Sequence, residues 1–218
     1  MNMAVSVMVT AFALSIISSA SAATLVNGSL TGPLDINLVP PGWSVLGGSP
    51  DTNDVDNNVG GGAAFVVPPT SPSPDGGTWV GLGQSPTLAE IFGQTITDFV
   101  VGQEYTLSWF AANFGAVSGP GYDEPNAFYA SLDGNVVGSG SVISLGPDWV
   151  AQSISFTATS MSHLVAFGLA DETNFSYLSI DGISLSPSAQ NPIPVPAAAP
   201  LMLAGFAGLT LRYRRRSV

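Results

Sequence analysis

The sequence has no lysine and no cysteine, and it contains a single histidine, His163. Its only basic residues are four arginines within the last seven positions, and all 15 acidic residues precede them. The absence of cysteine excludes disulfide frameworks, thiolate metal sites and cysteine nucleophiles. The absence of basic residues before position 212 leaves nothing to neutralise phosphates, so we expect no nucleic-acid partner.

Helical periodicity is also nearly absent between residues 23 and 186. Gly, Pro, Ser, Thr and Asn are frequent there, and Glu104–Phe110 and Trp149–Ala158 alternate apolar and polar side chains. Asp133-Gly134 favours a type I′ hairpin turn, because both positions accept a positive φ. Many short strands joined by turns predict an all-β fold, a single antiparallel β-sandwich over residues 23–186.

Other segments of this region give further predictions. Leu25–Leu30 and Ala63–Val67 read as short strands, and Pro86–Phe92 as one helical turn. Near the end of the region the alternation changes phase, from Leu178 and Ile180 to Ile183 and Leu185. Because strand side chains alternate strictly, this change predicts a β-bulge at Asp181-Gly182.

The N-terminal segment has the character of a targeting signal. Residues 1–17 are almost purely apolar, and Ala20-Ser21-Ala22 fits the small-x-small pattern that signal peptidase recognises. We therefore expect a signal peptide over residues 1–22 and export by the Sec machinery. The alternative is a buried N-terminal helix, since no Lys or Arg precedes the apolar run.

The C-terminal segment has three parts. A proline-rich linker with a short motif (187–196) is followed by an apolar run (197–211) and a basic tail (212–218). The run is about 15 residues, or roughly 22 Å as a helix, which is short for a bilayer core of roughly 30 Å. We expect a transmembrane helix with a cytoplasmic membrane stop, formed by Arg212, Arg214, Arg215 and Arg216. The alternative is the terminal helix of a soluble domain.

This tripartite end resembles a known sorting signal. Ile193-Pro194-Val195-Pro196-Ala197, the apolar run and the arginines are similar to the PEP-CTERM signals of Gram-negative bacteria, in the variant written V-P-L-P-A. Ile193 and Val195 stand where that variant usually has Val and Leu. The resemblance implies an exosortase partner, a membrane cysteine protease-transpeptidase, that recognises Pro194, Pro196 and Ala197. It also implies delivery to the cell surface or the exopolysaccharide matrix.

The region between the two signals resembles the jelly-roll sandwiches of the galactose-binding-like superfamily, which includes many carbohydrate-binding modules. The segments that carry this resemblance are Asn27–Ser29, Gly76–Val80, Gly93–Ile96, Val101–Leu107 and Ile180–Ile183. It implies polysaccharide binding and a structural calcium ion. An acidic calcium ligand often follows the opening Asn-Gly segment of that family, but Leu30-Thr31 stands here.

Candidate ligand-binding residues follow from this chemistry. Sugar rings stack on exposed aromatic side chains, and Trp43, Tyr122 and Tyr129 border predicted loops. Trp79, Trp109 and Trp149 are expected in the core. Carboxylates without Lys or Arg partners favour an external cation, and calcium prefers carboxylate and carbonyl oxygens. Asp181, at the bulge, is the first candidate ligand, and the alternative is that it bonds to nearby backbone N–H groups. The acidic loop with Asp54 and Asp56 is the second candidate, although a mobile polar loop is the favoured interpretation there.

Catalytic patterns are weak. His163 begins an apolar segment and no Gly-x-Ser-x-Gly motif occurs, so a strand-end histidine is the better interpretation. No spacing pairs the glutamates for glycoside hydrolysis, which are Glu90, Glu104, Glu124 and Glu172. The favoured prediction is a non-catalytic, exported surface or matrix protein that binds carbohydrate. A secreted glycoside hydrolase and a structural matrix protein without a specific ligand remain the alternatives.

Overall fold

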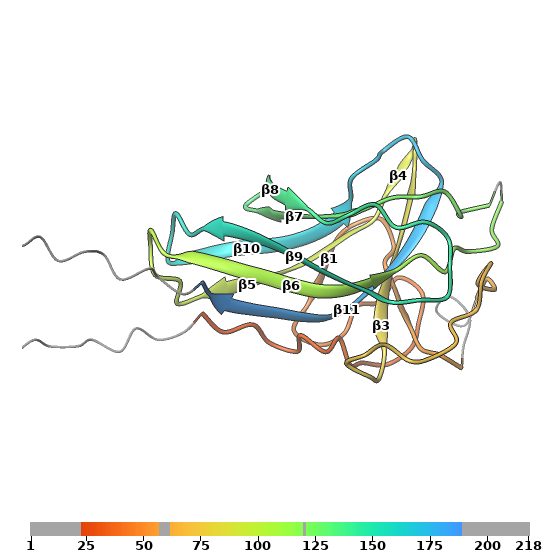
Figure 1. Ribbon diagram of the computed structural model, residues 1–218, viewed down its shortest axis with the longest axis horizontal. Helices are drawn as coiled ribbons and strands as arrows, with labels where there is room; N and C mark the ends of the chain where they lie inside the picture. The colour runs from red at the N-terminus through yellow and green to blue at the C-terminus, as the bar shows by residue number, and fades with distance from the viewer. Residues whose placement is uncertain (1–22, 57–61, 120, 189–218) are drawn as a thin grey trace, which may run out of the picture. The chain divides into compact units, whose positions relative to one another are not determined.

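A computed structural model describes residues 23–56, 62–119 and 121–188 of the chain. These residues form two antiparallel sheets packed face to face (Figure 1), and they contain no helix. The strand order is β1-β5-β10-β7-β8 in the five-stranded sheet and β2-β3-β11-β6-β9 in the six-stranded sheet, where β4 pairs with β3. The predicted all-β antiparallel β-sandwich is therefore confirmed.

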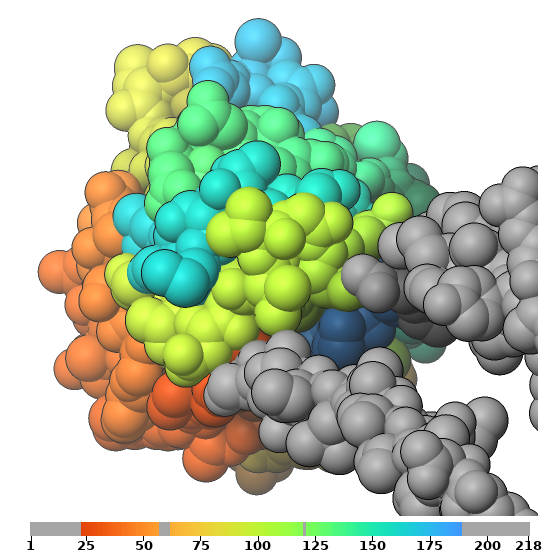
Figure 2. All heavy atoms as spheres, turned by 90° about the vertical axis from the view of Figure 1, so that its left-hand side faces the viewer, coloured from red at the N-terminus to blue at the C-terminus, as the bar shows by residue number. Residues whose placement is uncertain are grey.

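The strands of the five-stranded sheet are β1 (Ser44–Gly47), β5 (Ile91–Thr97), β7 (Phe128–Leu132), β8 (Asn135–Ser139) and β10 (Ser162–Leu169). Those of the six-stranded sheet are β2 (Asp51–Asn53), β3 (Trp79–Ser85), β4 (Leu88–Ala89), β6 (Glu104–Ala112), β9 (Val150–Thr157) and β11 (Ser176–Pro187). The chain changes sheet between β5 and β6 and again from β9 through β10 to β11, as it does in jelly rolls. The first described residues and the end of β11 lie at the same end of the sandwich (Figures 1 and 2).

The main core lies between the sheets and follows the predicted alternation. On β6, Tyr105, Leu107 and Trp109 are buried and point toward the five-stranded sheet. Trp109 packs edge-on against Phe167 of β10 with ring centroids 5.5 Å apart, so one aromatic contact joins the two sheets. Burying each such side chain contributes about 1.5–3 kcal/mol, and no disulfide assists because the chain has no cysteine.

The predicted hairpin and bulge are both present. Asp133 and Gly134 join β7 to β8 with φ values of 51° and 82°. On β11 the register against β6 shifts between Asp181 and Ser184, and Gly182 has a φ of 59°. The bulge lets the chain place apolar side chains in the main core on both sides of it.

Three local predictions are wrong. Leu25–Leu30 is irregular rather than a strand, since Asn27 and Leu30 have φ values of 52° and 46° that no strand accommodates. Ala63–Val67 is also irregular. Pro86–Phe92 is not helical, because a tight turn joins β3 to β4 and β5 follows at once.

A second apolar cluster lies on the outer face of the six-stranded sheet. Its buried members are Phe65, Trp79, Ala112, Phe114, Ala116 and Tyr177. Segment 64–67 reaches this face through two backbone hydrogen bonds, from Val67 N–H to Phe114 C=O and from Val117 N–H to Ala64 C=O. β3 is consequently buried on both faces along its whole length.

The predicted targeting elements cannot be compared with this fold. The signal peptide (1–22), the motif at 193–197, the apolar run and the basic tail all lie outside the described residues. Among the residues that are described, no helix has the length and hydrophobicity needed to cross a membrane.

Candidate functional site

Tyr129 lies on the outer face of the five-stranded sheet. Its neighbours Phe128 and Ala130 point into the main core, so strand alternation turns Tyr129 away from it. Tyr129 pairs with Gly168 of β10, and a Cβ built on that glycine would come within 2.5 Å of the Tyr129 hydroxyl oxygen. The glycine therefore allows the tyrosine ring to lie across the neighbouring strand, where it is half-buried.

The sheet face beside Tyr129 is formed by small side chains. Ala166 and Gly168 of β10 alternate with core residues, and Gly93 of β5 pairs with Ala166. Leu46 of β1 lies over Gly93, because a Cβ there would be 2.7 Å from the leucine Cδ1. Gly93, Ala166 and Gly168 are themselves buried, so the side chains of Tyr129 and Leu46 form the accessible part of this region of the sheet face.

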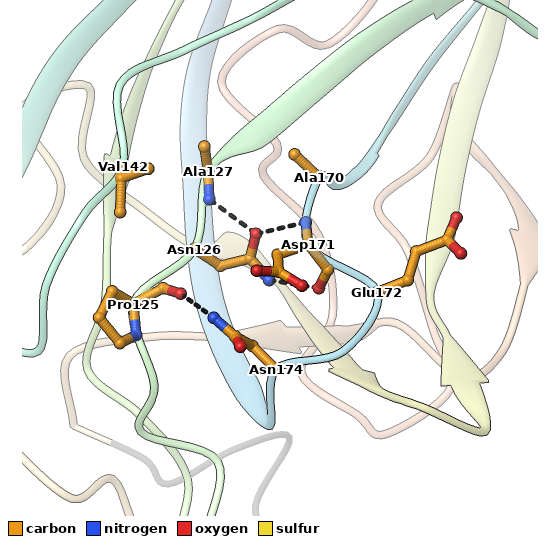
Figure 3. A pocket seen from close by; sticks show the side chains of 8 residues that line it. All are labelled: Pro125, Asn126, Ala127, Val142, Ala170, Asp171, Glu172 and Asn174. Carbon is orange, nitrogen blue, oxygen red and sulfur yellow. Dashed lines mark hydrogen bonds between the residues drawn. The ribbon is translucent and has the colours of Figure 1, made fainter.

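The charged residue Glu172 acts electrostatically on Tyr129. Burial raises the pKa of the Tyr129 hydroxyl, and the negative charge of Glu172 raises it further. Glu172 is exposed in the loop between β10 and β11. It lines two depressions, one of about 580 Å³ beside Asn126 and one of about 260 Å³ along the β3–β4 turn. Figure 3 shows its side chain directed away from Asn126.

Asn126 braces the floor of the larger depression (Figure 3). Its Oδ1 accepts hydrogen bonds from the N–H groups of Ala127 and Asp171, each at 2.9 Å. Its Nδ2 donates to the Asp171 carbonyl at 2.9 Å and to the Ser176 Oγ at 2.8 Å. Asn126 is therefore a structural residue, and it holds the loop that carries Glu172.

The three predicted sugar-stacking aromatics are not brought together. Trp43 is only 7% exposed and packs on Phe92 at 5.0 Å in the main core, so its prediction as a surface aromatic is wrong. Its indole N–H donates to the Asn27 carbonyl at 2.9 Å. Tyr122 is half-buried on the side of the six-stranded sheet and packs edge-on against Phe175 at 5.8 Å. Only Tyr129 lies on the outer face of the five-stranded sheet.

Asp181 has the surroundings expected of a buried cation ligand. It is completely buried, and neither carboxylate oxygen makes a hydrogen bond of normal geometry with the described residues, although the Ser73 side chain and the Gly182 backbone interact with it. Burial raises the pKa of Asp181 to about 7, and polar groups of Ser73 and Gly182 offset only part of this effect. The hydroxyl of Ser179, two residues before it on β11, is also buried without a partner. Carboxylate and hydroxyl oxygens are the kind of ligand that calcium takes, but these residues supply only part of its six to eight ligands.

Asp54 and Asp56 follow β2 in a partly exposed loop. The Asp56 N–H donates to the Asp54 carboxylate at 3.0 Å, which is a local turn contact. Across residues 23–56, 62–119 and 121–188, no three His, Cys, Asp or Glu side chains are grouped closely enough to hold a metal ion. Asp54, Asp56 and Asp181 therefore do not form one acidic metal cluster.

His163 has a structural role, in agreement with its interpretation as a strand-end histidine. Its Nε2 accepts hydrogen bonds from the N–H groups of Thr159 and Ser160 at 3.2 and 3.0 Å. This fixes the proton on Nδ1, which lies 2.6 Å from the Asp133 carboxylate. Both ring nitrogens are occupied, so His163 is not a general base here.

Comparison with known proteins supports the fold alone. No protein-family model matches the sequence, and no curated protein matches it. A cyclase from Fischerella sp. TAU, solved with 4-(1H-indol-3-yl)butan-2-one, is 16% identical with a TM-score of 0.55; the match covers 78% of this chain and all of the cyclase. The bacteriophage CBA120 tailspike protein 4 domain is 18% identical with a TM-score of 0.46, over 76% of this chain and 21% of that one. TmCBM61, solved with β-1,4-galactotriose, is 12% identical with a TM-score of 0.41, over 68% and 90%.

One group of buried polar residues was not predicted from the sequence. Asp51 and Glu90 are buried carboxylates, 7% and 5% exposed, and they line a common pocket with Tyr177. No sequence spacing pairs residues from β2, the β4–β5 junction and β11. One signal was present, since Gly81 and Gly83 occupy alternate positions of a strand and such glycines mark the close approach of other groups.

Proposed function

We propose that the chain is an exported, non-catalytic protein that binds carbohydrate on the outer face of its five-stranded sheet. The observation that supports this is the position of Tyr129, whose half-buried ring lies across Gly168 on the outer face of the sheet. An aromatic ring on an open sheet face stacks against the apolar face of a sugar. Glu172, in the adjoining loop, supplies acceptors for sugar hydroxyls.

The charge of the protein narrows the ligand class. The region from residue 23 to 188 contains all 15 acidic residues and no Lys or Arg. Anionic polysaccharides would be repelled by this surface, and nothing on it could pair with uronate or sulfate groups. The proposed ligand is therefore a neutral polysaccharide.

Calcium is proposed as a structural ion rather than as part of the sugar site. Asp181 and Ser73 would hold it, because the Asp181 carboxylate is buried without a hydrogen bond of normal geometry and the Ser73 side chain interacts with it. A bound divalent cation would keep that carboxylate ionised inside the protein. Its effect would be to stabilise the bulge of β11 and the segment around Ser73.

Export and sorting complete the proposal. A signal peptide over residues 1–22 would direct the chain to the Sec machinery, and an exosortase would act at the Pro194–Ala197 motif. The product would reside at the cell surface or in the exopolysaccharide matrix of a Gram-negative bacterium. Terminal sequencing and intact mass of the surface-released protein test this, and a product that still carries Arg212 and the arginines after it would contradict sorting.

The carbohydrate proposal is tested by affinity electrophoresis in gels that contain neutral polysaccharides: a β-glucan, a xylan, a galactan or a mannan. For the polysaccharide that retards the native protein, we expect Tyr129→Ala to weaken binding about tenfold or more, equivalent to about 1.4 kcal/mol. Tyr129→Phe should retain most of the affinity because it keeps the ring. Met161→Ala, at a site that is 70% exposed, is the matched surface control.

Three outcomes would overturn the proposal. Retardation by none of the four polysaccharides would favour a structural matrix protein without a specific ligand. Release of reducing sugar, lost on a Glu-to-Gln substitution, would favour a hydrolase. Equal binding by the native protein and Tyr129→Ala would place any carbohydrate site elsewhere.

A further inference from the structure

The pocket that contains Asp51 and Glu90 lies on the six-stranded sheet, separate from the Tyr129 face. Its volume is about 280 Å³. The walls combine apolar side chains, Ile36 and Leu88, with the half-buried Tyr122. The polar part of the pocket includes the two carboxyl groups and the hydroxyl of Tyr177. Tyr177 as a whole residue is 4% exposed.

Each carboxyl group is fixed by hydrogen bonds from the protein. Glu90 Oε2 accepts from the Gly83 N–H at 2.6 Å, and Glu90 Oε1 accepts from the Ser49 hydroxyl at 2.9 Å. Asp51 Oδ2 accepts from the Tyr177 hydroxyl at 2.9 Å, and Asp51 Oδ1 from the Asn37 N–H at 3.1 Å. A carboxylate oxygen has two lone pairs, so each retains acceptor capacity beyond these bonds.

Glycines in the surrounding chain make this arrangement possible. A Cβ on Gly81 would lie 2.0 Å from the Tyr177 hydroxyl oxygen, so the phenol occupies the space of a side chain on β3. A Cβ on Gly48 would lie 2.6 Å from Glu90 Cγ, and one on Gly83 would lie 3.3 Å from Glu90 Oε2. The sheet is shaped to admit polar groups that are costly to bury.

The negative charge of the pocket has no cationic partner within the described part of the chain. That part contains no Lys or Arg, and His163, its single histidine, is bonded to Asp133. Burial raises the pKa of Glu90 to about 7 and also raises the pKa of Asp51. The Asp51 charge adds to the shift of Glu90, so the two groups repel each other. A bound cation would relieve both the desolvation and the repulsion.

Two features favour an organic cation over a metal ion. Asp35 raises the pKa of Asp51, but no three acidic or histidine side chains of the described residues are grouped closely enough to hold a metal ion, and calcium takes six to eight oxygen ligands. The pocket also presents apolar walls and two tyrosine rings, which suit an alkyl chain and the attraction of an ammonium group to aromatic faces. We propose that this pocket binds a small organic cation, a primary or quaternary ammonium that carries a short apolar chain.

The probe is n-butylammonium, added to the purified full-length protein and followed by isothermal titration calorimetry, with n-butanol as its neutral counterpart. We expect n-butylammonium to bind at about pH 8, where Glu90 is mostly ionised, and to bind several-fold more weakly at about pH 6, where it is mostly protonated. The titratable groups that face Glu90 are Asp51 and Tyr177, and Tyr122 lines the same pocket. Glu90→Gln should lower affinity about tenfold and abolish the difference between the two pH values.

Controls separate this site from general attraction to an acidic protein. Glu104→Gln removes an exposed carboxylate at the start of β6 and should leave the affinity unchanged. Asp51→Asn gives a second variant if Glu90→Gln does not fold, and it should also weaken binding. The proposal is overturned if n-butanol binds as well as n-butylammonium, if both pocket variants bind like the native protein, or if calcium chloride displaces the amine stoichiometrically at low concentration. None of these outcomes bears on the Tyr129 face.

Discussion

Two buried carboxyl groups should make this protein less stable as the pH rises through neutrality. Burial raises the pKa of Glu90 from 4.5 to about 7 and that of Asp181 from 3.8 to about 7. In the unfolded chain both groups are exposed to water and titrate near their ordinary values. Between about pH 4 and pH 7 the folded protein therefore binds more protons than the unfolded chain, and its stability falls as the pH rises.

The size of the effect follows from the same pKa values. Raising the pH from about 6 to about 8 removes most of one proton from each group in the folded state, while the unfolded groups are already ionised. Each group then lowers the free energy of unfolding by about 1.4 kcal/mol, and the two together by roughly 3 kcal/mol. For a chain of this length, that corresponds to a fall in Tm of roughly 5–10 °C.

Thermal melting followed by circular dichroism, with a chelator present, measures this fall. Glu90→Gln and Asp181→Asn should each remove about half of it, and Glu104→Gln, at an exposed position, should leave it unchanged. With calcium in place of the chelator, the part of the fall in Tm that is due to Asp181 should disappear, because the ion holds the carboxylate ionised. The prediction is wrong if Tm is the same at the two pH values, or if both variants show the full fall in Tm of the native protein. A Tm that is the same with calcium and with chelator would remove the metal ion from the proposal.

The remaining predictions concern packing, hydrogen bonding and proteolysis. In urea unfolding, Gly81→Ala should destabilise the protein by about 3 kcal/mol or more, because its Cβ would lie 2.0 Å from the Tyr177 hydroxyl oxygen. Gly146→Ala is the control and should change the free energy of unfolding little, because its Cβ would have one neighbouring atom, at 3.9 Å. His163→Ala should cost about 2–4 kcal/mol in the same assay, since it leaves two N–H donors without their acceptor and opens a cavity; a loss below about 0.5 kcal/mol would contradict the structural role. Trypsin should cut the unfolded full-length chain only at the arginines of segment 212–216, and mass spectrometry of the digest would expose any other cleavage.

Much of the fold could be predicted because its signals are local. Strict alternation identified β6 and β9, the Asp133-Gly134 pair identified the β7–β8 hairpin, and the change of phase identified the bulge at Asp181. The errors occurred where a tertiary contact overrides local pattern. Ala63–Val67 has the composition of a strand, but it buries Phe65 against the outer face of a sheet that is already formed.

The candidate sites divide in the same way. The bulge at Asp181 was predicted because a bulge changes the phase of the apolar alternation along one strand. Tyr129 and Trp43 were indistinguishable as aromatics beside loops, and only the packing of the two sheets placed Trp43 inside and left Tyr129 on an outer face. The Asp51–Glu90 pocket could not be found at all, because hydrogen bonds between residues far apart in the sequence assemble it, Tyr177 with Asp51 and Ser49 with Glu90.

By itself, the sequence determined the chemistry available to this protein: an acidic β-sandwich without disulfides, Lys or Arg, in which every buried carboxylate must be hydrogen-bonded, protonated or matched by an external cation. These properties depend only on which residues are present and on their local order. The tertiary structure decided which carboxylates are buried, that two of them share a pocket, and which aromatic ring lies on an open sheet face. These features depend on strand pairing and sheet packing. Such contacts join residues more than 80 positions apart, such as Asp51 and Tyr177, and they produce no periodic pattern in the sequence.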